Sequence, residues 1–261
     1  MLSNQFPFSF FKLTEDRSFK KPRAKGVTMM IDRGYPNSHL QDHLDLIAPY
    51  VDYGKIETAT SRIYPSEYLK AKVALYKKND ISPFIGGVFL EKVFNQHRMD
   101  GLDLYLDELQ RFKFEVMEVS DNYGNMSKKD RLTIIRTCIK CGFEVLAEVG
   151  LKDAHESVDK IVSLVHQDLE TGAKIVIIEG SELFDEGQPN HALIEAIHTN
   201  FDPNQIMFEL NGPWIPGVHL CDTYKLLVFL IDTFGPDVNI GNVDLKHVFE
   251  TENDRLGLHT L

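Results

Sequence analysis

Short apolar runs alternate along the chain with longer stretches in which apolar residues recur every three to four positions. The runs are rich in Val, Ile and Phe and end in Gly or a polar residue, which is typical of parallel strands buried on both faces. This pattern predicts strands at residues 27–32, 51–57, 81–87, 114–120, 143–150, 174–180, 205–210 and 237–243. It predicts helices at about 38–48, 65–79, 100–112, 127–141, 155–171, 190–200, 222–234 and 244–250.

The repeated strand–helix unit predicts right-handed crossovers and a parallel sheet. Eight units in about 240 residues match the size of a closed (β/α)8 barrel, the TIM barrel. A doubly wound open sheet is the alternative, but it usually has a phosphate loop after its first strand, and neither G-x-G-x-x-G nor G-x-x-x-x-G-K-[ST] occurs. We therefore predict a single-domain α/β barrel over residues 21–261, the catalytic domain. Residues 1–20 would form an N-terminal appendage that covers one end of it.

The composition and net charge of the chain limit the kinds of molecule that it can bind. The chain has 261 residues, 43% of them hydrophobic, which is enough for a well-buried core. A net charge of −11 without a long Lys/Arg cluster argues against binding nucleic acid or an anionic membrane. No apolar run reaches the roughly 18 residues of a membrane span, and the first residues lack a signal-peptide pattern. Three cysteines fit a reducing compartment, so we expect a cytoplasmic protein that binds small molecules.

Polar and charged residues gather where the predicted strands end, which is the end of such a barrel that carries chemistry. They include Asp32, Arg33, Lys55, Glu118, Ser120, Glu148, Lys152, Glu179, Glu209, Asn239 and Asn242. Four successive apolar runs end in a glutamate, and side chains alternate between the two faces of a strand. If the glutamates face the barrel interior, Glu118, Glu148, Glu179 and Glu209 converge.

Converging carboxylates require positive charge, because an unpaired buried carboxylate is costly to desolvate. A cation with oxygen ligands and an incomplete protein shell would be Mg²⁺. Lys55 and Lys152 would add positive charge, and a lysine in such surroundings can transfer a proton. The alternative is that these residues are solvated loop entries or structural ion pairs. The stretch 238-VNIGNV-243 begins the last strand-to-helix loop, where backbone N–H groups often bind phosphate.

Several stretches carry a resemblance to a known family. They are 22-PRAKGVTMMIDRG-34, 51-VDYGKIETATSRIYP-65, 84-FIGGVFLE-91, 112-FKFEVMEVSDN-122, 142-GFEVLAEVGLKD-153, 168-DLETGAKIVIIEG-180, 206-IMFEL-210, 234-FGPDVNIGNV-243 and 255-RLGL-258. On these stretches the chain resembles the phosphosulfolactate synthase family over nearly its whole length.

The resemblance implies a lyase that adds sulfite to phosphoenolpyruvate with Mg²⁺, giving (2R)-phospho-3-sulfolactate on a route to coenzyme M. The family's catalytic lysine falls on Lys152, and a second family lysine falls on Lys55. Together with the strand-end pattern, this predicts catalysis by Lys152, Lys55 and Glu148, and Mg²⁺ binding by Glu118, Glu148, Glu179 and Glu209. It predicts binding of an anionic substrate by Asp32, Arg33, Ser120, Asn239, Gly241 and Asn242. The family forms oligomers, so we expect a homo-oligomer.

Some positions depart from the family pattern. Glu57 adds a negative charge where an anion should approach, Ser181 and His259 stand where the family has arginine, and the 211–221 loop with Trp214 is longer. Each lost charge-assisted contact would cost roughly 1.5–3 kcal/mol of binding, unless Arg62 and Arg255 compensate. Two alternatives remain open: a different reaction on the same barrel with a less anionic substrate, or a non-catalytic, stress-associated relative.

Overall fold

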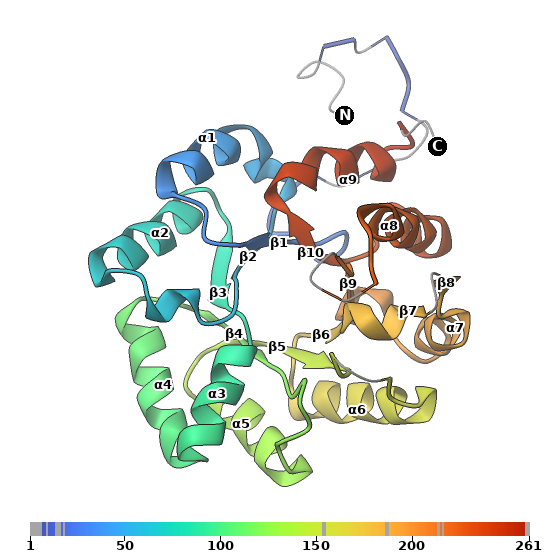
Figure 1. Cartoon of the computed structure of the whole chain (residues 1–261). Coiled ribbons are helices and arrows are strands. Elements are labelled where there is room, and N and C mark those ends of the chain that lie inside the picture. The colour runs from blue at the N-terminus through green and yellow to red at the C-terminus, as the bar shows by residue number, and fades with distance from the viewer. Residues whose placement is uncertain are drawn as a thin grey trace.

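Eight parallel strands form a ring that is surrounded by helices (Figure 1). The computed structural model describes residues 7–8, 10–13, 17, 19–152, 155–185, 188–212, 215 and 217–258. The ring strands are β1 (Thr28–Asp32), β2 (Tyr53–Ile56), β3 (Ser82–Ile85), β4 (Val116–Val119), β5 (Glu144–Val149), β6 (Ile175–Ile178), β9 (Ile206–Glu209) and β10 (Ile240–Asp244). Their order is β3-β2-β1-β10-β9-β6-β5-β4. The first and last ring strands, β1 and β10, pair in parallel, and β3 lies against β4, so the barrel is nearly closed.

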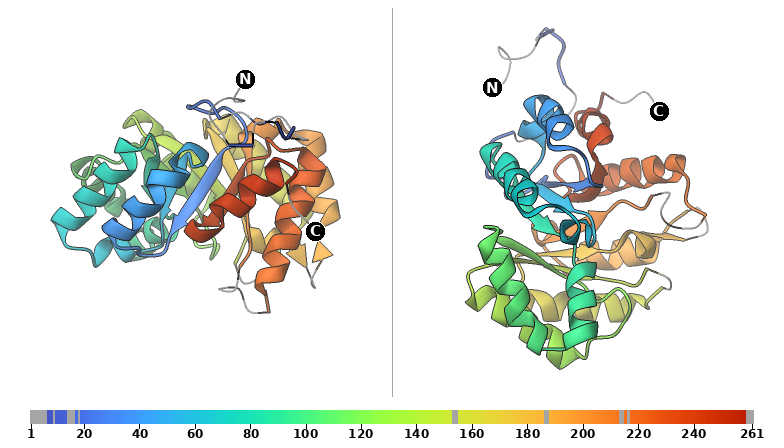
Figure 2. Two further views of the ribbon diagram at one scale, coloured as in Figure 1. Left: turned by 90° about the horizontal axis from the view of Figure 1, so that it is seen from above. Right: turned by 60° about the vertical axis from the view of Figure 1, so that its left-hand side comes forward.

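The helices surround the ring of strands when the barrel is viewed along its axis (Figure 1), and Figure 2 shows the molecule from two further directions. In the described ranges they are α1 (Asn37–Ile47), α2 (Ser66–Lys78), α3 (Val88–His97), α4 (Asp100–Arg111), α5 (Lys128–Lys140), α6 (Val158–Thr171), α7 (His191–Asn200), α8 (Leu220–Phe234) and α9 (Val248–Arg255). The predicted single-domain (β/α)8 barrel is confirmed, and the open-sheet alternative is wrong. Within these ranges, no helix is long and apolar enough to cross a membrane.

The structure departs from the predicted elements at a few places. Helix α3 was not predicted: the sequence analysis placed Gly86 and Gly87 in the strand 81–87 and assigned no element to the residues between 88 and 99. Strands β7 (Phe184–Asp185) and β8 (Gln188–Pro189) form a short antiparallel pair outside the ring. The prediction that residues 238–243 begin the last loop is wrong, because Ile240–Asp244 is the strand β10 and a helical turn, Leu245–His247, follows it directly.

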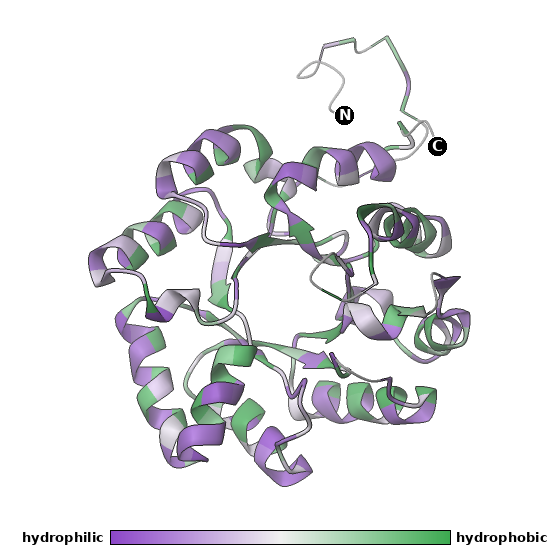
Figure 3. Ribbon diagram, viewed as in Figure 1, coloured by the Kyte–Doolittle hydropathy of each residue, from purple (hydrophilic) through white to green (hydrophobic). Residues whose placement is uncertain are grey.

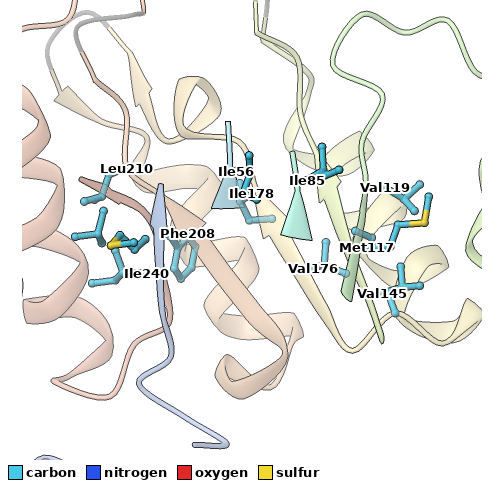
Figure 4. Close-up of a cluster of buried hydrophobic side chains, with 14 of the residues drawn as sticks. Ile56, Ile85, Met117, Val119, Val145, Val176, Ile178, Phe208, Leu210 and Ile240 are labelled. Carbon is cyan, nitrogen blue, oxygen red and sulfur yellow. The ribbon is translucent and has the colours of Figure 1, made fainter. Parts of the chain in front are cut away.

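Two apolar clusters hold the barrel together. The outer cluster lies between the strands and the helices, whose apolar faces turn toward the ring (Figure 3); Ile178, Phe208 and Ile240 are among its members (Figure 4). The inner cluster fills the barrel and consists of Val27, Met29, Tyr53, Phe84, Val116, Leu146, Ile175, Ile177 and Met207. The two clusters correspond to the two faces of each strand, which is why the strands read as continuous apolar runs.

The period of two along each strand determines what lies above the inner cluster. Polar residues stand two positions after inner-cluster residues: Lys55 after Tyr53, Glu118 after Val116, Glu148 after Leu146, Glu179 after Ile177 and Glu209 after Met207. Side chains separated by two positions share a face of the strand. The barrel interior is therefore apolar toward the amino ends of the strands and polar at their carboxyl ends.

Arg17 binds at the other end of the barrel. Its guanidinium Nη2 donates to the backbone oxygen of Gly26 at 2.8 Å and to Glu252 Oε1 at 2.9 Å. Gly26 precedes β1, so this contact lies where strands enter the ring. The division between an appendage of residues 1–20 and the barrel stays a prediction.

Candidate active site

Lys55 lies at the centre of a buried cluster at the carboxyl ends of the strands. Its Nζ is 2.6 Å from Glu209 Oε1, 3.0 Å from Glu118 Oε2 and 3.2 Å from Glu148 Oε2. All four side chains are almost inaccessible to solvent. An ammonium group has three hydrogens, so a single lysine can neutralise part of the charge of all three glutamates at once.

A second ion pair stands beside this cluster. Lys152 Nζ lies 3.8 Å from Glu179 Oε2, and the Lys152 side chain is 36% exposed while Glu179 is buried. Asn242 Nδ2 donates to Glu209 Oε2 at 2.7 Å and so completes the shell of that carboxylate. The structure thus brings together both predicted lysines and all four predicted glutamates. When all four carboxyl groups are ionised, the four negative and two positive charges leave a net charge of −2 in a largely buried space.

Burial and charge move the pKa values of these groups in opposite directions. Burial raises the pKa of Glu118 to about 8, against the effect of Lys55. Burial and the neighbouring carboxylates of Glu148 and Glu209 raise the pKa of Glu179 well above its usual range. Burial would also raise the pKa of Glu148, but Lys55 and Lys152 outweigh it and hold that pKa low. Glu148 therefore stays ionised at neutral pH, whereas Glu118 largely retains its proton there; the pKa of Glu179 is shifted in the same direction as that of Glu118.

The lysines stay charged. Burial lowers the pKa of Lys55, but Glu118, Glu209 and Glu148 raise it further, to a value well above the usual range. Burial also lowers the pKa of Lys152, and Glu148 and Glu179 again outweigh it, so the net shift is upward. Both amines are therefore protonated at neutral pH.

The cluster fits a divalent cation. Carboxylate oxygens of Glu118, Glu148 and Glu209 lie within 4.8 Å of one another, and oxygen donors are the ligands that Mg²⁺ prefers. Within the described chain, the buried atoms Glu148 Oε1 and Glu179 Oε2 have no hydrogen-bond partner. A divalent cation would also cancel the net charge of −2 that the site carries once all four carboxyl groups have lost their protons. The donor set and the charge both match a divalent cation held by Glu118, Glu148 and Glu209, whereas Glu179, the fourth predicted ligand, is not part of this group.

We expect the affinity for a divalent cation to increase with pH. The raised pKa of Glu118, about 8, means that its carboxyl holds a proton at pH 6 that the cation must displace. For each displaced proton, the binding constant for Mg²⁺ should rise about tenfold per pH unit between pH 6 and 8. Isothermal titration calorimetry in two buffers of different ionisation enthalpy measures both the affinity and the protons released. A binding constant that is the same at pH 6 and pH 8 would contradict this expectation.

A second polar layer supports Glu118, and the sequence analysis did not predict it. The backbone N–H of Gly87 donates to Glu118 Oε1 at 2.7 Å, and a Cβ at Gly87 would lie 2.9 Å from that oxygen. Glu91, buried on α3, accepts hydrogen bonds from Ser120 Oγ and Asn122 Nδ2. A carboxylate in the apolar stretch 88–94 was the available signal for Glu91, but α3 itself was not predicted.

Two predicted substrate-binding residues lie elsewhere. Asp32 is fully buried and points away from the barrel interior, where it accepts hydrogen bonds from Lys72 Nζ at 2.5 Å and Tyr76 Oη at 2.9 Å. Asn239 precedes β10 at the opposite end of the barrel, where its Oδ1 accepts from the backbone N–H of Val27 at 2.9 Å. Both side chains stabilise the fold and are not available to a ligand at the glutamate cluster.

The other predicted substrate-binding residues surround the cluster at different depths. Gly241 lies on the inner face of β10, where a Cβ would meet Met29, Met207 and Glu209, so its lack of a side chain leaves room for Glu209. Ser120 is buried and bound to Glu91. Asn242 contacts Glu209 directly.

Glu57 and Arg255, which the sequence analysis related to the binding of an anion, have partners that it did not predict. Glu57 is not an unpaired negative charge, because its Oε1 accepts from Arg33 Nη1 at 2.8 Å. Arg33 Nε also lies 3.6 Å from Asp244 Oδ2. Arg255 cannot compensate for the missing arginines, because it is fully buried and donates to the carbonyl oxygens of Pro236 and Val238 at the opposite end of the barrel. His259 and Trp214 lie outside the described residues.

Carboxylates and lysines converge at the carboxyl ends of the strands of this (β/α)8 barrel. Enzymes with this fold have their active sites at that end, so the class of protein is a (β/α)8-barrel enzyme. A family model described as (2R)-phospho-3-sulfolactate synthase matches residues 16–260, so the chain belongs to the phosphosulfolactate synthase family, a family of lyases. The phosphosulfolactate synthase of Methanocaldococcus jannaschii is 30% identical over 245 residues, which cover 90% of this chain and 92% of that protein. That of Bacillus subtilis is 28% identical over 251 residues, covering 92% and 93%.

Solved structures support the fold alone. A 3-hexulose-6-phosphate synthase superimposes with a TM-score of 0.54 at 15% identity, over 90% of this chain and 99% of that chain. The 3-dehydroquinate dehydratase of Aquifex aeolicus superimposes with a TM-score of 0.56 at 11% identity, over 90% and 100%. Similarity at this level of identity carries no information about the reaction.

Proposed function

We propose that the protein adds sulfite to phosphoenolpyruvate with the help of Mg²⁺ and forms (2R)-phospho-3-sulfolactate, on a route to coenzyme M. The observation that supports this most strongly is the convergence of Lys55, Lys152 and four glutamates in a chain of this family. Lysines suit an anionic substrate, and carboxylates suit the cation that would accompany it.

The reaction requires one new carbon–sulfur bond and one proton. The sulfur lone pair of sulfite bonds to C3 of phosphoenolpyruvate, the electrons of the C2=C3 double bond move to C2 and its carboxylate, and a proton then joins C2. A divalent cation, when bound by the glutamates, would supply Lewis-acid stabilisation of the developing negative charge. The side chains of the barrel must bind the substrate and hold the proton.

The two lysines fit different roles. Lys55 is surrounded by three carboxylates within 3.2 Å, so it serves as their counter-ion and is not free to move to a substrate. Lys152 has one ion-pair contact in the described chain, at 3.8 Å, and its side chain is partly exposed. It is protonated before the reaction, because the net shift of its pKa is upward. We therefore assign the transfer of the proton to Lys152.

Direct assay tests the proposal. Purified protein is incubated with phosphoenolpyruvate, sulfite and Mg²⁺ between pH 6 and 9, and the sulfonate is measured by mass spectrometry. Omission of sulfite, and chelation of the metal with EDTA, serve as controls. Formation of phosphosulfolactate only in the complete mixture would support the assignment, and its absence across the whole pH range would refute it.

Asn211 is a candidate substrate contact that the sequence analysis missed. It follows β9 on the side of Glu209, is 1% exposed, and has no hydrogen-bond partner on either side-chain polar atom within the described chain. Such a buried amide costs about 1–3 kcal/mol. We expect Asn211→Leu to increase the free energy of unfolding by about 1 kcal/mol and to raise KM by about tenfold, because the substrate loses a polar partner. Urea denaturation and steady-state kinetics check this, and an unchanged KM would show that Asn211 does not contact the substrate.

A less anionic substrate on the same barrel is the second candidate. Arg33 is already shared between Glu57 and Asp244, and Ser181 bonds the backbone of Leu151 where the family has an arginine. Both observations reduce the positive charge available to a phosphate and a sulfite. Thermal-shift measurements separate the candidates, since a ligand that binds the folded state raises its melting temperature. Stabilisation by phosphoenolpyruvate would favour the first candidate, and stabilisation only by neutral or monoanionic metabolites would favour the second.

Homo-oligomer formation is also part of the proposal. The apolar side chains of Leu46, Ile63 and Leu104 are 63%, 80% and 65% exposed, and association of copies would remove such surface from water. Light scattering coupled to size-exclusion chromatography determines the assembly state, and a monomer at all concentrations would argue against it.

A further inference from the structure

The loop between β5 and α6 carries Lys152, whose amine makes one ion-pair contact with the described residues, to Glu179 Oε2 at 3.8 Å. A long lysine side chain has many rotamers, and a proton donor must lie within hydrogen-bond reach of the accepting atom. The position of the Lys152 backbone therefore decides which atoms its amine can reach. The backbone N–H of Lys152 itself donates weakly to the carbonyl oxygen of Asn122, at 3.5 Å. Leu151 and Glu156, on either side of it, are bound by the helical turn Gly180–Leu183 that follows β6.

This turn bonds to the loop through two side chains. Ser181 Oγ donates to the backbone oxygen of Leu151 at 2.6 Å. Glu182 Oε1 accepts from the backbone N–H of Leu151 at 2.9 Å, and Glu182 Oε2 accepts from the N–H of Glu156 at 3.1 Å. Glu182 is completely buried. The two side chains therefore fix the backbone immediately before Lys152 and again four residues after it.

Close packing at Gly150 reinforces these bonds. Gly150 has a φ of +119°, which L side chains rarely adopt, and a Cβ there would lie 2.7 Å from Glu182 Cγ and 2.8 Å from Glu179 Cβ. The turn and the start of the loop thus meet without space for a side chain. The carboxylate that faces the Lys152 amine, Glu179, directly precedes the same turn.

We propose that Ser181 and Glu182 are positioning residues that hold the Lys152 loop so that the amine stays beside Glu179 at the mouth of the barrel. The consequence for catalysis rests on the proposed function, in which Lys152 supplies the proton. Ser181 and Glu182 themselves do not touch the reacting atoms. They act through the backbone of the loop.

A first experiment tests the loop without substrates. In Glu182→Ala, the backbone amides of Leu151 and Glu156 should exchange hydrogen at least about tenfold faster, and the labelling rate of Lys152 by an amine reagent should change. Glu182→Gln should restore most of the protection, because its amide oxygen can still accept from both N–H groups. Ser127→Ala, which removes a side-chain-to-backbone hydrogen bond at the N-terminus of α5, should leave both amides unchanged. Unchanged exchange and labelling in Glu182→Ala would overturn the proposal.

A second experiment uses the sulfite-addition assay. Ser181→Ala and Glu182→Ala should lower kcat by about 10- to 100-fold with KM within about twofold, because only the alignment of the proton donor is lost. Combined with Lys152→Ala, neither should lower kcat further, since both act through Lys152. Independent, multiplying effects would overturn the positioning role. If the unmodified protein forms no sulfonate, the proposed function fails, while faster exchange and altered labelling still support the hold on Lys152.

Discussion

Replacement of Lys152 by alanine is expected to lower kcat for sulfonate formation by about 10³-fold, within the range for loss of a general acid. The amine is protonated at neutral pH, because Glu148 and Glu179 outweigh the effect of burial on its pKa, and it is the more exposed of the two lysines. KM for phosphoenolpyruvate should change by less than about tenfold, since one of the two cations remains. Steady-state kinetics measure both parameters.

Two further variants make this expectation specific. Lys152→Arg keeps the positive charge but cannot release a proton, because the guanidinium pKa exceeds about 12; it should remain as slow as Lys152→Ala. Lys160→Ala, at an exposed position of α6, should retain full activity. If Lys152→Arg were as active as the unmodified protein, Lys152 would only bind the substrate and the proton would come from another group.

Replacement of Lys55 by methionine is expected to lower the free energy of unfolding by about 3–5 kcal/mol at pH 8 in EDTA. Removal of one partner from a buried ion pair leaves uncompensated charge, and here Glu118, Glu148 and Glu209 would all lose their shared counter-ion. Urea denaturation followed by circular dichroism measures the loss. Saturating Mg²⁺ should reduce it, because the cation supplies charge to the same carboxylates.

The pH dependence of this loss has a definite sign. Without Lys55, the buried carboxyl groups have raised pKa values and bind more protons in the folded state than in the unfolded state. Folding is then favoured as the pH falls, so the deficit should shrink between pH 8 and about pH 5. Lys174→Met provides the control, because Lys174 pairs with Glu144 at 2.6 Å on the surface, where a pair contributes roughly 0–1 kcal/mol. Equal losses in the two variants, or a loss independent of pH, would contradict the role of Lys55.

The eight strands of the ring and the four glutamates of the site could be predicted from local sequence patterns. The eight apolar runs coincide with the eight ring strands, and the period of two correctly predicted that Glu118, Glu148, Glu179 and Glu209 share the interior. Those features depend only on the direction of side chains along one strand. Asp32 was placed in the site because it ends a strand, but its face of β1 turns toward α2, where Lys72 binds it.

Contacts between segments that lie far apart in the sequence could not be predicted from such local patterns. The proximity of Glu57 to Arg33, the burial of Arg255 at the far end and the bonds from Ser181 and Glu182 to the Lys152 loop join separate strand–helix units. No local period encodes the register between such units. A motif can indicate that a residue lies near a strand end, but not which neighbour already satisfies its charge.

The amino-acid sequence by itself determined the repeated strand–helix unit and the row of glutamates at the strand ends, because alternation along a strand is a local property. Only the tertiary structure decided that Lys55 serves three carboxylates at once, that Lys152 remains partly exposed and that a turn after β6 holds its loop. These features depend on closure of the ring, which brings side chains from β2, β4, β5 and β9 within a few ångströms of one another and fixes their charges and pKa values together.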